Sequence, residues 1–240
     1  MTSTPLAFVA GATGYTGRAV VAALRAAGVR TVAHVRPGSS GAAAHAQRFA
    51  AVGAEVDGTP WEPAAMRATL ARLRPDHVFA LLGTTRRRAA REGLADPYER
   101  IDYGLTRTLL DAATAAGSAP RFTYLSALGA SETSGNPYLR VRGRLERELR
   151  EGPLPWLVAQ PAFVTGSDRE EFRLGERVFA ITTDAVLGAA RAVGLGVLRD
   201  RYGSLTGAQL GRGMVRLALT DRTGRVLADV RALRAAGAAP

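Results

Sequence analysis

Three glycines near the N-terminus have the spacing of a phosphate-binding loop. Gly11, Gly14 and Gly17 follow the apolar run LAFVA at 6–10 and precede the apolar stretch at 19–24. In a strand–loop–helix unit, such glycines allow a tight turn, a close approach of the backbone to pyrophosphate and close packing of helix on strand. The free N–H groups at the start of the helix then face the phosphates. An ordinary glycine-rich turn is the alternative, but the flanking strand and helix favour a dinucleotide site.

The loop and the end of the second expected strand carry the candidate cofactor contacts. In the loop these are Gly11, Thr13, Gly14, Tyr15, Thr16, Gly17 and Arg18. After the second strand comes Arg36, where an enzyme that uses NAD usually has Asp or Glu for the ribose 2′-hydroxyl. A guanidinium can instead pair with the 2′-phosphate of NADP. The sequence therefore favours NADP(H), with a merely solvent-exposed Arg36 as the alternative in a chain so rich in arginine.

These residues need a parallel sheet flanked by helices to position them. Short apolar or β-branched runs alternate with helical stretches, which is the pattern of βαβ units. The expected strands cover 6–10, 31–35, 54–56, 77–81, 121–125 and 156–160, and the expected helices cover 15–27, 42–51, 63–73, 98–116 and 138–150. Right-handed crossovers then predict an α/β, doubly wound parallel sheet, the Rossmann fold.

The chain has the length of one large domain. Its 240 residues can bury one sizeable core, and we expect a single NAD(P)-binding Rossmann domain over 1–240. Beyond residue 166 the strand rhythm fades into a charged loop at 167–171, an apolar helical stretch at 185–197, a helix at 206–219, a short strand at 226–227 and a helix at 229–236. We expect residues 166–240 to form a small C-terminal cap on the substrate side.

The net charge of +11 invites a nucleic-acid interpretation, but composition weakens it. All 32 basic residues are arginine, which indicates a general compositional bias. The clearest basic run, at 86–88 with Arg91, is short and has no interleaved aromatic residues, and charge runs are usually solvated surface. Nucleic-acid binding is therefore the weakest functional hypothesis, and we expect no nucleic-acid partner.

Several other classes of protein are disfavoured. The chain has no cysteine, and its three histidines, His34, His45 and His77, are not spaced like ligands, so we expect no metal. It has no uninterrupted apolar run of about 18 residues. The N-terminus also lacks the basic and apolar regions of a secretory signal. The sequence thus predicts a soluble, cytoplasmic protein without a membrane segment.

Four motifs together resemble the atypical short-chain dehydrogenase/reductase superfamily. They are the loop GATGYTGR at 11–18, LLGTT at 81–85, YLSA at 124–127 and YLRVRG at 138–143. The stretch 136–178 is similar to the Tat-interactive-protein-like oxidoreductases and their bacterial relatives. The resemblance spans about residues 6–180 and implies a Rossmann fold that binds NAD(P)H.

The resemblance implies a catalytic set of Ser126, Tyr138 and Arg142. Ser126 would orient the substrate carbonyl and Tyr138 would donate the proton, while Arg142 stands where the superfamily usually has the lysine that binds the nicotinamide ribose. A tyrosine has an ordinary pKa near 10 and needs a nearby cation to act at neutral pH. Since the chain contains no lysine, Arg142 is the residue left for that role. The alternative is that Ser126 ends a strand and Tyr138 packs on the sheet.

The same resemblance implies further cofactor contacts. Asp57 would hydrogen-bond the adenine amino group, Gly83 and Thr84 would lie along the adenosine half, and the backbone around Pro161 would touch the nicotinamide carboxamide. Asp102 occupies a position where related enzymes often carry Asn. An exposed helix surface explains that position equally well, and the sequence assigns Asp102 no role.

The favoured function is an NADPH-dependent oxidoreductase that reduces a small carbonyl or quinone by hydride transfer. The apolar segment 179–197 would line its substrate site. The alternative is a catalytically weak or inactive NADP(H)-binding sensor or interaction protein, which Arg142 in place of lysine would favour. The sequence names neither the substrate nor the oligomeric state.

Overall fold

The computed structural model describes residues 4–39, 41–84, 93, 95–165, 203–221 and 223–238. Its strands are β1 Leu6–Ala10, β2 Arg30–His34, β3 Glu55–Asp57, β4 His77–Ala80, β5 Arg121–Leu125, β6 Trp156–Ala159, β7 Val164–Thr165, β8 Leu205–Thr206 and β9 Arg225–Ala228. Its helices are α1 Tyr15–Ala26, α2 Ala42–Ala51, α3 Pro63–Leu73, η1 Tyr98–Leu105, α5 Thr106–Ala115, α6 Pro137–Glu151, α9 Gly207–Thr220 and α10 Val230–Gly237. The basic run at 86–88 and the expected helical stretches at 185–197 and 179–197 lie outside the described residues.

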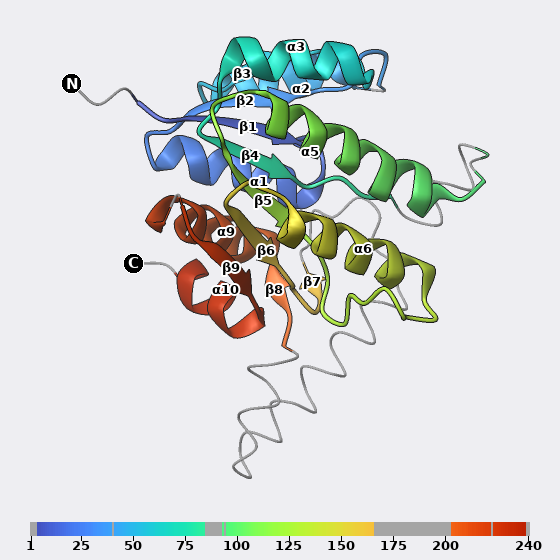
Figure 1. Ribbon diagram of the computed structural model, residues 1–240. Helices are drawn as coiled ribbons and strands as arrows, with labels where there is room; N and C mark the ends of the chain where they lie inside the picture. Colours follow the sequence, from blue (N-terminus) through green and yellow to red (C-terminus); the bar gives the residue numbers. More distant parts are fainter. Residues whose placement is uncertain are drawn as a thin grey trace.

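Seven strands form one parallel sheet in the order β3-β2-β1-β4-β5-β6-β9. β1 is an inner strand, with Phe8 level with Val32 of β2 on one side and with Val78 of β4 on the other. The strand order reverses between β1 and β4, and their carboxyl ends point to the same edge (Figure 1). In such sheets the ligand crevice lies outside that edge, at the reversal. The predicted Rossmann fold is confirmed.

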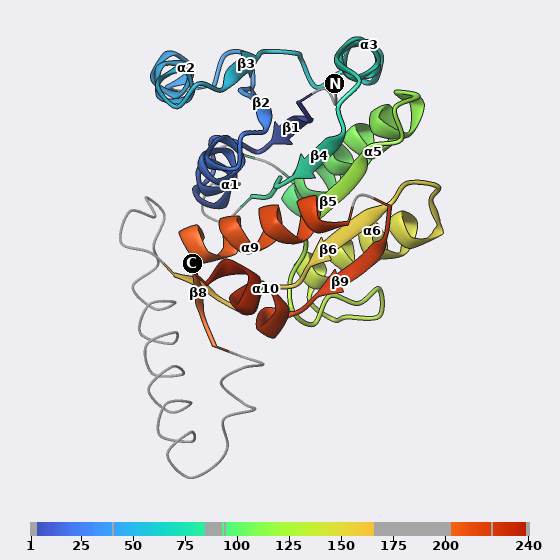
Figure 2. The ribbon, with the colours of Figure 1, turned by 90° about the vertical axis from the view of Figure 1, so that its left-hand side faces the viewer.

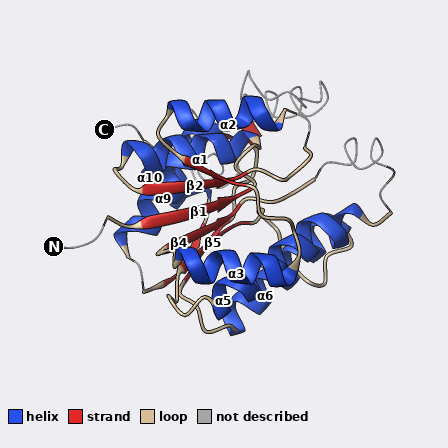
Figure 3. Cartoon of the chain, turned by 90° about the horizontal axis from the view of Figure 1, so that it is seen from above, coloured by secondary structure: helices blue, strands red, loops and turns tan. Residues whose placement is uncertain are grey.

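Helices cover both faces of the sheet. Figures 2 and 3 show α1, α9 and α10 on one face and α3, α5 and α6 on the other. Side chains of a strand alternate between faces, so Phe8 joins the core beneath α5 and α6, whereas Val9 joins the core beneath α1 and α9. All five residues of β1 are buried because both faces are covered. The continuous apolar run at 6–10 is the sequence signature of that burial.

The expected helix at 98–116 differs from the structure in its first half. Residues 98–105 form the π-helix η1, and a regular helix begins only at Thr106. A π-helix has wider turns than an α-helix and is often found at functional sites. Apolar residues at three- and four-residue spacing do not distinguish the two, so the sequence predicted one continuous helix. The wider turn carries Asp102, which is fully buried.

The expected cap stays a prediction, because residues 166–202 lie outside the described residues. Among the residues described after them, β9 pairs with β6 as the seventh strand, with Leu227 level with Val158, and α9 packs along α1. These later residues therefore extend the sheet and its helical layer. The sequence did not predict this pairing because the period of a short strand does not reveal its partner. The small parallel pair of β7 and β8, which joins residues 41 positions apart, was also missed for that reason.

His34 ends β2 beneath the carboxyl edge of the sheet. Its side chain is buried, its Nε2 lies 2.7 Å from the carbonyl oxygen of Thr59, and its ring packs against Trp61 with the centroids 4.8 Å apart. Burial lowers the pKa of His34, and the contact with the Thr59 carbonyl and the charge of Asp57 only partly oppose this. The fold therefore favours the neutral imidazole.

We predict that mild acid destabilises the fold through His34. In the unfolded chain the imidazole has its ordinary pKa near 6.5, so below that pH the unfolded chain takes up the proton more readily than the folded chain. The stabilising contribution is thus present at neutral pH and is lost as the pH falls through the lowered folded-state pKa. Tm measured at a series of pH values from about 7.5 to about 5 should fall, and less steeply in His34→Gln. Equal slopes for His34→Gln and wild type would contradict the assignment.

Candidate functional site

The glycine loop has the backbone geometry that a dinucleotide requires. Gly11 has a φ of 80°, and a Cβ on it would lie 2.5 Å from the carbonyl oxygen of Leu81. A Cβ on Gly17 would collide with the backbone of Gly11 and Ala12, so this glycine lets α1 pack directly on the loop. Gly14 caps α1 in an extended conformation without a side-chain hydrogen bond. The first N–H groups of α1 are thus directed to the loop, where a phosphate would bind.

The larger loop residues brace the loop. The Arg18 guanidinium donates to the carbonyl oxygen of Thr13 at 2.9 Å. The Tyr15 hydroxyl donates to the carbonyl oxygen of Thr165 at 3.0 Å and accepts from the N–H of Gly207 at 3.3 Å. Thr16 is half-buried in the first turn of α1. The expected contacts Thr13, Tyr15, Thr16 and Arg18 therefore lie at the loop, and the side chains of Tyr15 and Arg18 already bind protein atoms.

Arg36 follows β2, and Asp57 is the last residue of the neighbouring strand β3. Arg36 is exposed, and its carbonyl oxygen accepts hydrogen bonds from the N–H and hydroxyl of Ser39. The Asp57 carboxylate accepts from the Thr59 N–H at 3.0 Å and from the Thr59 hydroxyl at 2.9 Å. Asp57 thus caps its own turn. Of these two residues, Arg36 is the one whose side chain has no hydrogen-bond or ion-pair partner within the described part of the chain.

Gly83, Thr84 and Pro161 follow β4 and β6. Gly83 is exposed, and a Cβ on it would lie 2.8 Å from Nη2 of Arg142. The Thr84 N–H donates to Oδ2 of Asp102 at 3.0 Å, and the carbonyl oxygen of Pro161 accepts from the N–H of Leu128 at 3.0 Å. The structure thereby brings all the expected cofactor positions to one edge of the sheet. The glycine loop leaves space that a side chain would occupy, and the N-terminus of α1 faces that space. This arrangement fits a dinucleotide.

Arg142 is buried on α6 beside the ends of β4 and β5. Its guanidinium donates to Oδ1 of Asp102 at 2.7 Å, to the carbonyl oxygen of Leu82 at 3.1 Å and to the carbonyl oxygen of Leu125. Burial disfavours the charged guanidinium, but Tyr124, Tyr138 and Asp102 outweigh this effect and raise the pKa of Arg142. Arg142 is therefore a fixed cation.

Asp102 is the partner that the sequence analysis missed. It has no exposed surface, and its two oxygens join Arg142 of α6 to the Thr84 N–H after β4. Burial raises the pKa of the Asp102 carboxyl, while the Arg142 charge and the Thr84 N–H oppose that rise. The arginine at position 142 was the available signal, because a buried guanidinium requires a carboxylate within reach. The exposed-surface alternative for Asp102 is wrong.

Tyr138 stands in the first turn of α6, half-buried above Arg142. The guanidinium carbon of Arg142 lies 5.0 Å from the centre of the Tyr138 ring and 5.5 Å from that of Tyr124. A cation at this distance from a ring face is attracted to it. Within the described residues the Tyr138 hydroxyl has no hydrogen-bond partner. The structure thus brings Tyr138 and Arg142 together and leaves the phenol available.

Ser126 has a different environment from the one expected. It is 2% exposed, and its hydroxyl donates to Oε1 of the buried Glu146 at 2.5 Å. Glu146 also accepts from the Gln160 amide at 2.8 Å and from Arg150 at 2.6 Å. A hydroxyl has one hydrogen to donate, so Ser126 in this arrangement cannot also donate to a substrate carbonyl. No hydrogen bond joins Ser126 to Tyr138 among the described residues.

A stripe along α6 explains this arrangement. Residues 138, 142, 146 and 150 recur at four-residue spacing and therefore lie on one face of the helix. Arg142 donates hydrogen bonds to carbonyl oxygens at the ends of β4 and β5. Glu146 accepts hydrogen bonds from side chains that follow β5 and β6. Glu146 was missed by the sequence analysis although its position, four residues after Arg142, gave the signal.

The described residues contain neither a candidate metal cluster nor a helix that could span a membrane. No group of three or more His, Asp or Glu residues in this part of the chain could hold a metal ion. None of its helices combines the length and the apolar character that a membrane span requires.

Comparison with known proteins identifies the kind of site. A family described as NAD(P)H-binding matches residues 11–186. Among curated proteins, the chain is 36% identical over 89 residues to "Protein FMP52-1, mitochondrial" of Scheffersomyces stipitis, across 37% of this chain and 38% of that protein. It is 35% identical over 100 residues to "Protein fmp52-1, mitochondrial" of Aspergillus terreus, across 41% of each chain. The match thus spans well under half of these relatives.

Solved structures share the fold at low sequence identity. The UDP-glucose 4-epimerase from Brucella ovis, in complex with NAD, has a TM-score of 0.65 at 15% identity and covers 96% of this chain and 81% of its own. The UDP-Glc/GlcNAc 4-epimerase from Campylobacter jejuni has a TM-score of 0.66 at 13% identity, covering 96% and 82%. At these identities the likeness establishes the Rossmann fold alone.

The expected cytoplasmic location is contradicted by these curated relatives. Three of them carry "mitochondrial" in their names, at low identity and partial coverage. The expectation rested on the lack of a secretory signal and of a long apolar run. Neither feature separates the cytoplasm from a mitochondrial compartment, because mitochondrial targeting uses amphipathic, arginine-rich segments.

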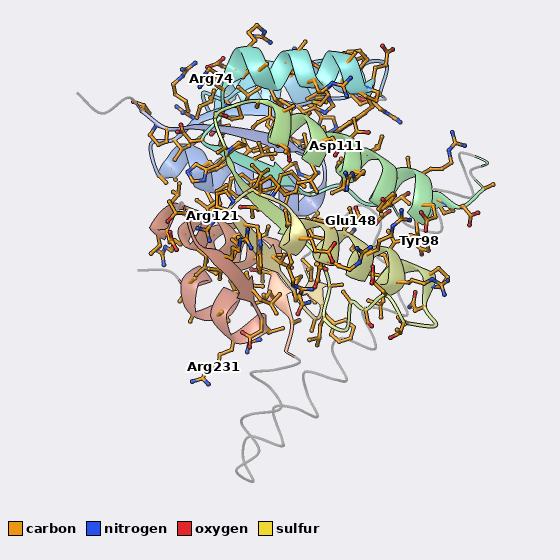
Figure 4. All side chains as sticks on the ribbon, viewed as in Figure 1. Arg74, Tyr98, Asp111, Arg121, Glu148 and Arg231 are labelled. Atoms are coloured by element: carbon orange, nitrogen blue, oxygen red, sulfur yellow. The ribbon has the colours of Figure 1, made fainter. Side chains whose placement is uncertain are left out.

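We predict that Asp102→Asn is far more destabilising than Asp111→Asn. Both changes neutralise a carboxylate that lies 2.7 Å from an arginine. The side chains of Asp102 and Arg142 are buried, whereas those of Asp111, which is labelled in Figure 4, and Arg107 are 48% and 41% exposed. Loss of one partner of a buried pair costs about 3–5 kcal/mol. An exposed pair contributes about 0–1 kcal/mol. Urea unfolding of both variants measures the difference, and equal small losses would show that the buried pair is not needed for stability.

Proposed function

The chain belongs to the NAD(P)H-binding family, and from this premise we propose that it is an NADPH-dependent oxidoreductase that reduces a small carbonyl or quinone. The resemblance to the atypical short-chain dehydrogenase/reductase superfamily is confirmed at the level of this family and of the fold. One observation carries the proposal. The available phenol of Tyr138 lies over the buried cation of Arg142, at the sheet edge that also holds the glycine loop.

The chemistry follows from this arrangement. Bound NADPH would supply a hydride to the substrate. Tyr138 would donate a proton to the oxygen that becomes negative, so that a carbonyl becomes an alcohol or a quinone becomes a hydroquinone with the same two electrons. Arg142 holds a positive charge beside the Tyr138 ring, and Asp102 holds its guanidinium in place. Solvent then returns the proton to Tyr138.

Arg142 differs from a lysine in one functional respect. It stays protonated, so it acts as a fixed charge and cannot pass a proton onward. Its N–H groups are also directed to Asp102 and to the carbonyl oxygens of Leu82 and Leu125. The proposed role of Arg142 is therefore electrostatic, and contact with the nicotinamide ribose is a smaller part of it.

A second candidate function has its own support. Ser126 gives its hydrogen to Glu146, and Arg142 is 4% exposed, so two of the three expected catalytic groups are committed to protein atoms. A protein that binds NADP(H) as a sensor or interaction partner, without turnover, would not need the Ser126 hydroxyl or the Arg142 guanidinium to contact a substrate. Ser126 can orient a carbonyl only when its hydroxyl turns away from Glu146.

We predict that Tyr138→Phe abolishes NADPH oxidation and leaves NADPH affinity unchanged. The change removes the proton donor but keeps the ring over Arg142, and loss of a general acid lowers kcat by about 10²-fold or more. NADPH oxidation is followed by absorbance with a panel of quinones and aldehydes, and Kd is measured by fluorescence titration. Tight NADPH binding by the wild type without any oxidation would instead favour the sensor. No binding of NADPH or NADH would reject both candidates.

We further predict that Arg36 selects NADPH over NADH. A charge-assisted contact with the 2′-phosphate contributes about 1.5–3 kcal/mol, so Arg36→Ala should raise the Kd for NADPH roughly tenfold to a hundredfold and leave the Kd for NADH unchanged. Arg18→Ala is the control, because it loosens the loop at Thr13 and should weaken both nucleotides equally. An unchanged ratio of the two Kd values in Arg36→Ala would show that Arg36 is a solvated surface residue.

A further inference from the structure

Four of the six tyrosines of the chain gather where η1 meets α6. They are Tyr98, Tyr103, Tyr124 and Tyr138. Tyr98 is the first residue of η1, and its ring centre lies 5.6 Å from that of Tyr138, with the two planes at 59°. In Figure 4 Tyr98 lies toward the side to which the strands point, near the start of η1. The proposed proton donor thus has a second phenol beside it.

Tyr103, from the same helix, shows what a structural tyrosine looks like here. Its hydroxyl donates to Glu148 at 3.0 Å, and the guanidinium carbon of Arg144 lies 3.8 Å from its ring centre. Burial and the contact with Glu148 raise the pKa of Tyr103. Packing and ion pairs therefore account for both its ring and its hydroxyl.

Tyr98 lacks these polar attachments. It is half-buried and packs against the core beneath α5 and α6, as Tyr103 does, and within the described residues its hydroxyl has no hydrogen-bond partner. Its ring also lies against the ring of Tyr138, which in turn contacts Arg142. Core packing thus accounts for part of the Tyr98 ring, and its contact with the proposed proton donor distinguishes it from Tyr103.

We propose that Tyr98 is a specificity-determining residue that favours a planar aromatic substrate, a quinone, over an aliphatic carbonyl. This inference rests on the proposed function, of which it narrows the substrate class. Aromatic rings prefer offset or edge-to-face contacts with centres 4.5–7 Å apart. Two rings at 59° offer a face and an edge to a third flat molecule, whereas an aliphatic aldehyde gains little from either. A quinone bound in this way has its oxygen beside the Tyr138 hydroxyl.

The test compares ring loss at two positions of η1. Tyr98→Leu and Tyr98→Met remove the ring under study, Tyr98→Phe keeps it, and Tyr103→Leu removes the structural ring. For each variant, kcat/KM with NADPH is measured for 1,4-naphthoquinone and for hexanal. In Tyr98→Leu and Tyr98→Met the value for the quinone should fall about fivefold to tenfold and the value for hexanal should not change. Tyr98→Phe and Tyr103→Leu should keep the wild-type ratio of the two substrates.

A binding measurement tests the preference for an aromatic ligand without requiring turnover. The NADP⁺ complex is titrated calorimetrically with 1-naphthol, which is planar, and with cyclohexanol, which is saturated. The wild type should bind 1-naphthol more tightly, and Tyr98→Leu should remove this preference. Equal losses for quinone and hexanal, or a preference that survives in both Tyr98→Leu and Tyr98→Met, would overturn the proposal. If the wild type reduces neither substrate, the proposed reductase fails, and the titration alone then supports or overturns the aromatic preference.

Discussion

The burial of the Arg142 guanidinium is the constraint on which the arrangement of the site depends. A buried cation needs a carboxylate and enough hydrogen-bond acceptors to replace water. Asp102 and the carbonyl oxygens of Leu82 and Leu125 meet this need, and they come from η1, β4 and β5. One side chain thereby ties four elements together at the carboxyl edge of the sheet. The position of Tyr138 and the approach of Gly83 to the edge both depend on it.

Much of the fold was predictable because its signals are local. The period of apolar residues fixed the strands and helices up to β6, and the glycine spacing identified the loop whose Gly11 and Gly17 leave no room for a side chain. The seventh strand and the pair of β7 and β8 depend on contacts between distant residues, which short apolar runs do not specify. The π-helix was missed because its turns differ from an α-helix in hydrogen bonding and hardly in sequence pattern.

The candidate site was predictable as a set of positions and much less as a set of interactions. The expected cofactor residues do meet at one edge, since they lie at or just after the ends of parallel strands, and α6 brings Tyr138 and Arg142 to the same edge. Their partners came from α6 and η1, where Asp102 and Glu146 are acidic residues in otherwise ordinary helical sequence. Asp102 and Glu146 differ from surface acids only because a buried arginine and a buried serine each need a hydrogen-bond acceptor there. The direction in which Ser126 gives its hydrogen is likewise a property of the packed structure.

The brace between Tyr15 and Gly207 joins residues 192 positions apart. α9, which begins at Gly207, also covers the apolar face of α1. During synthesis the ribosome therefore releases the nucleotide loop long before the chain that secures it. Until α9 has emerged, α1 exposes two valines and a leucine that the finished protein buries, and contacts of such long range form slowly. The first segment that could recognise a cofactor is thus among the last to become rigid, and a nucleotide bound early would hold it while the rest of the chain arrives.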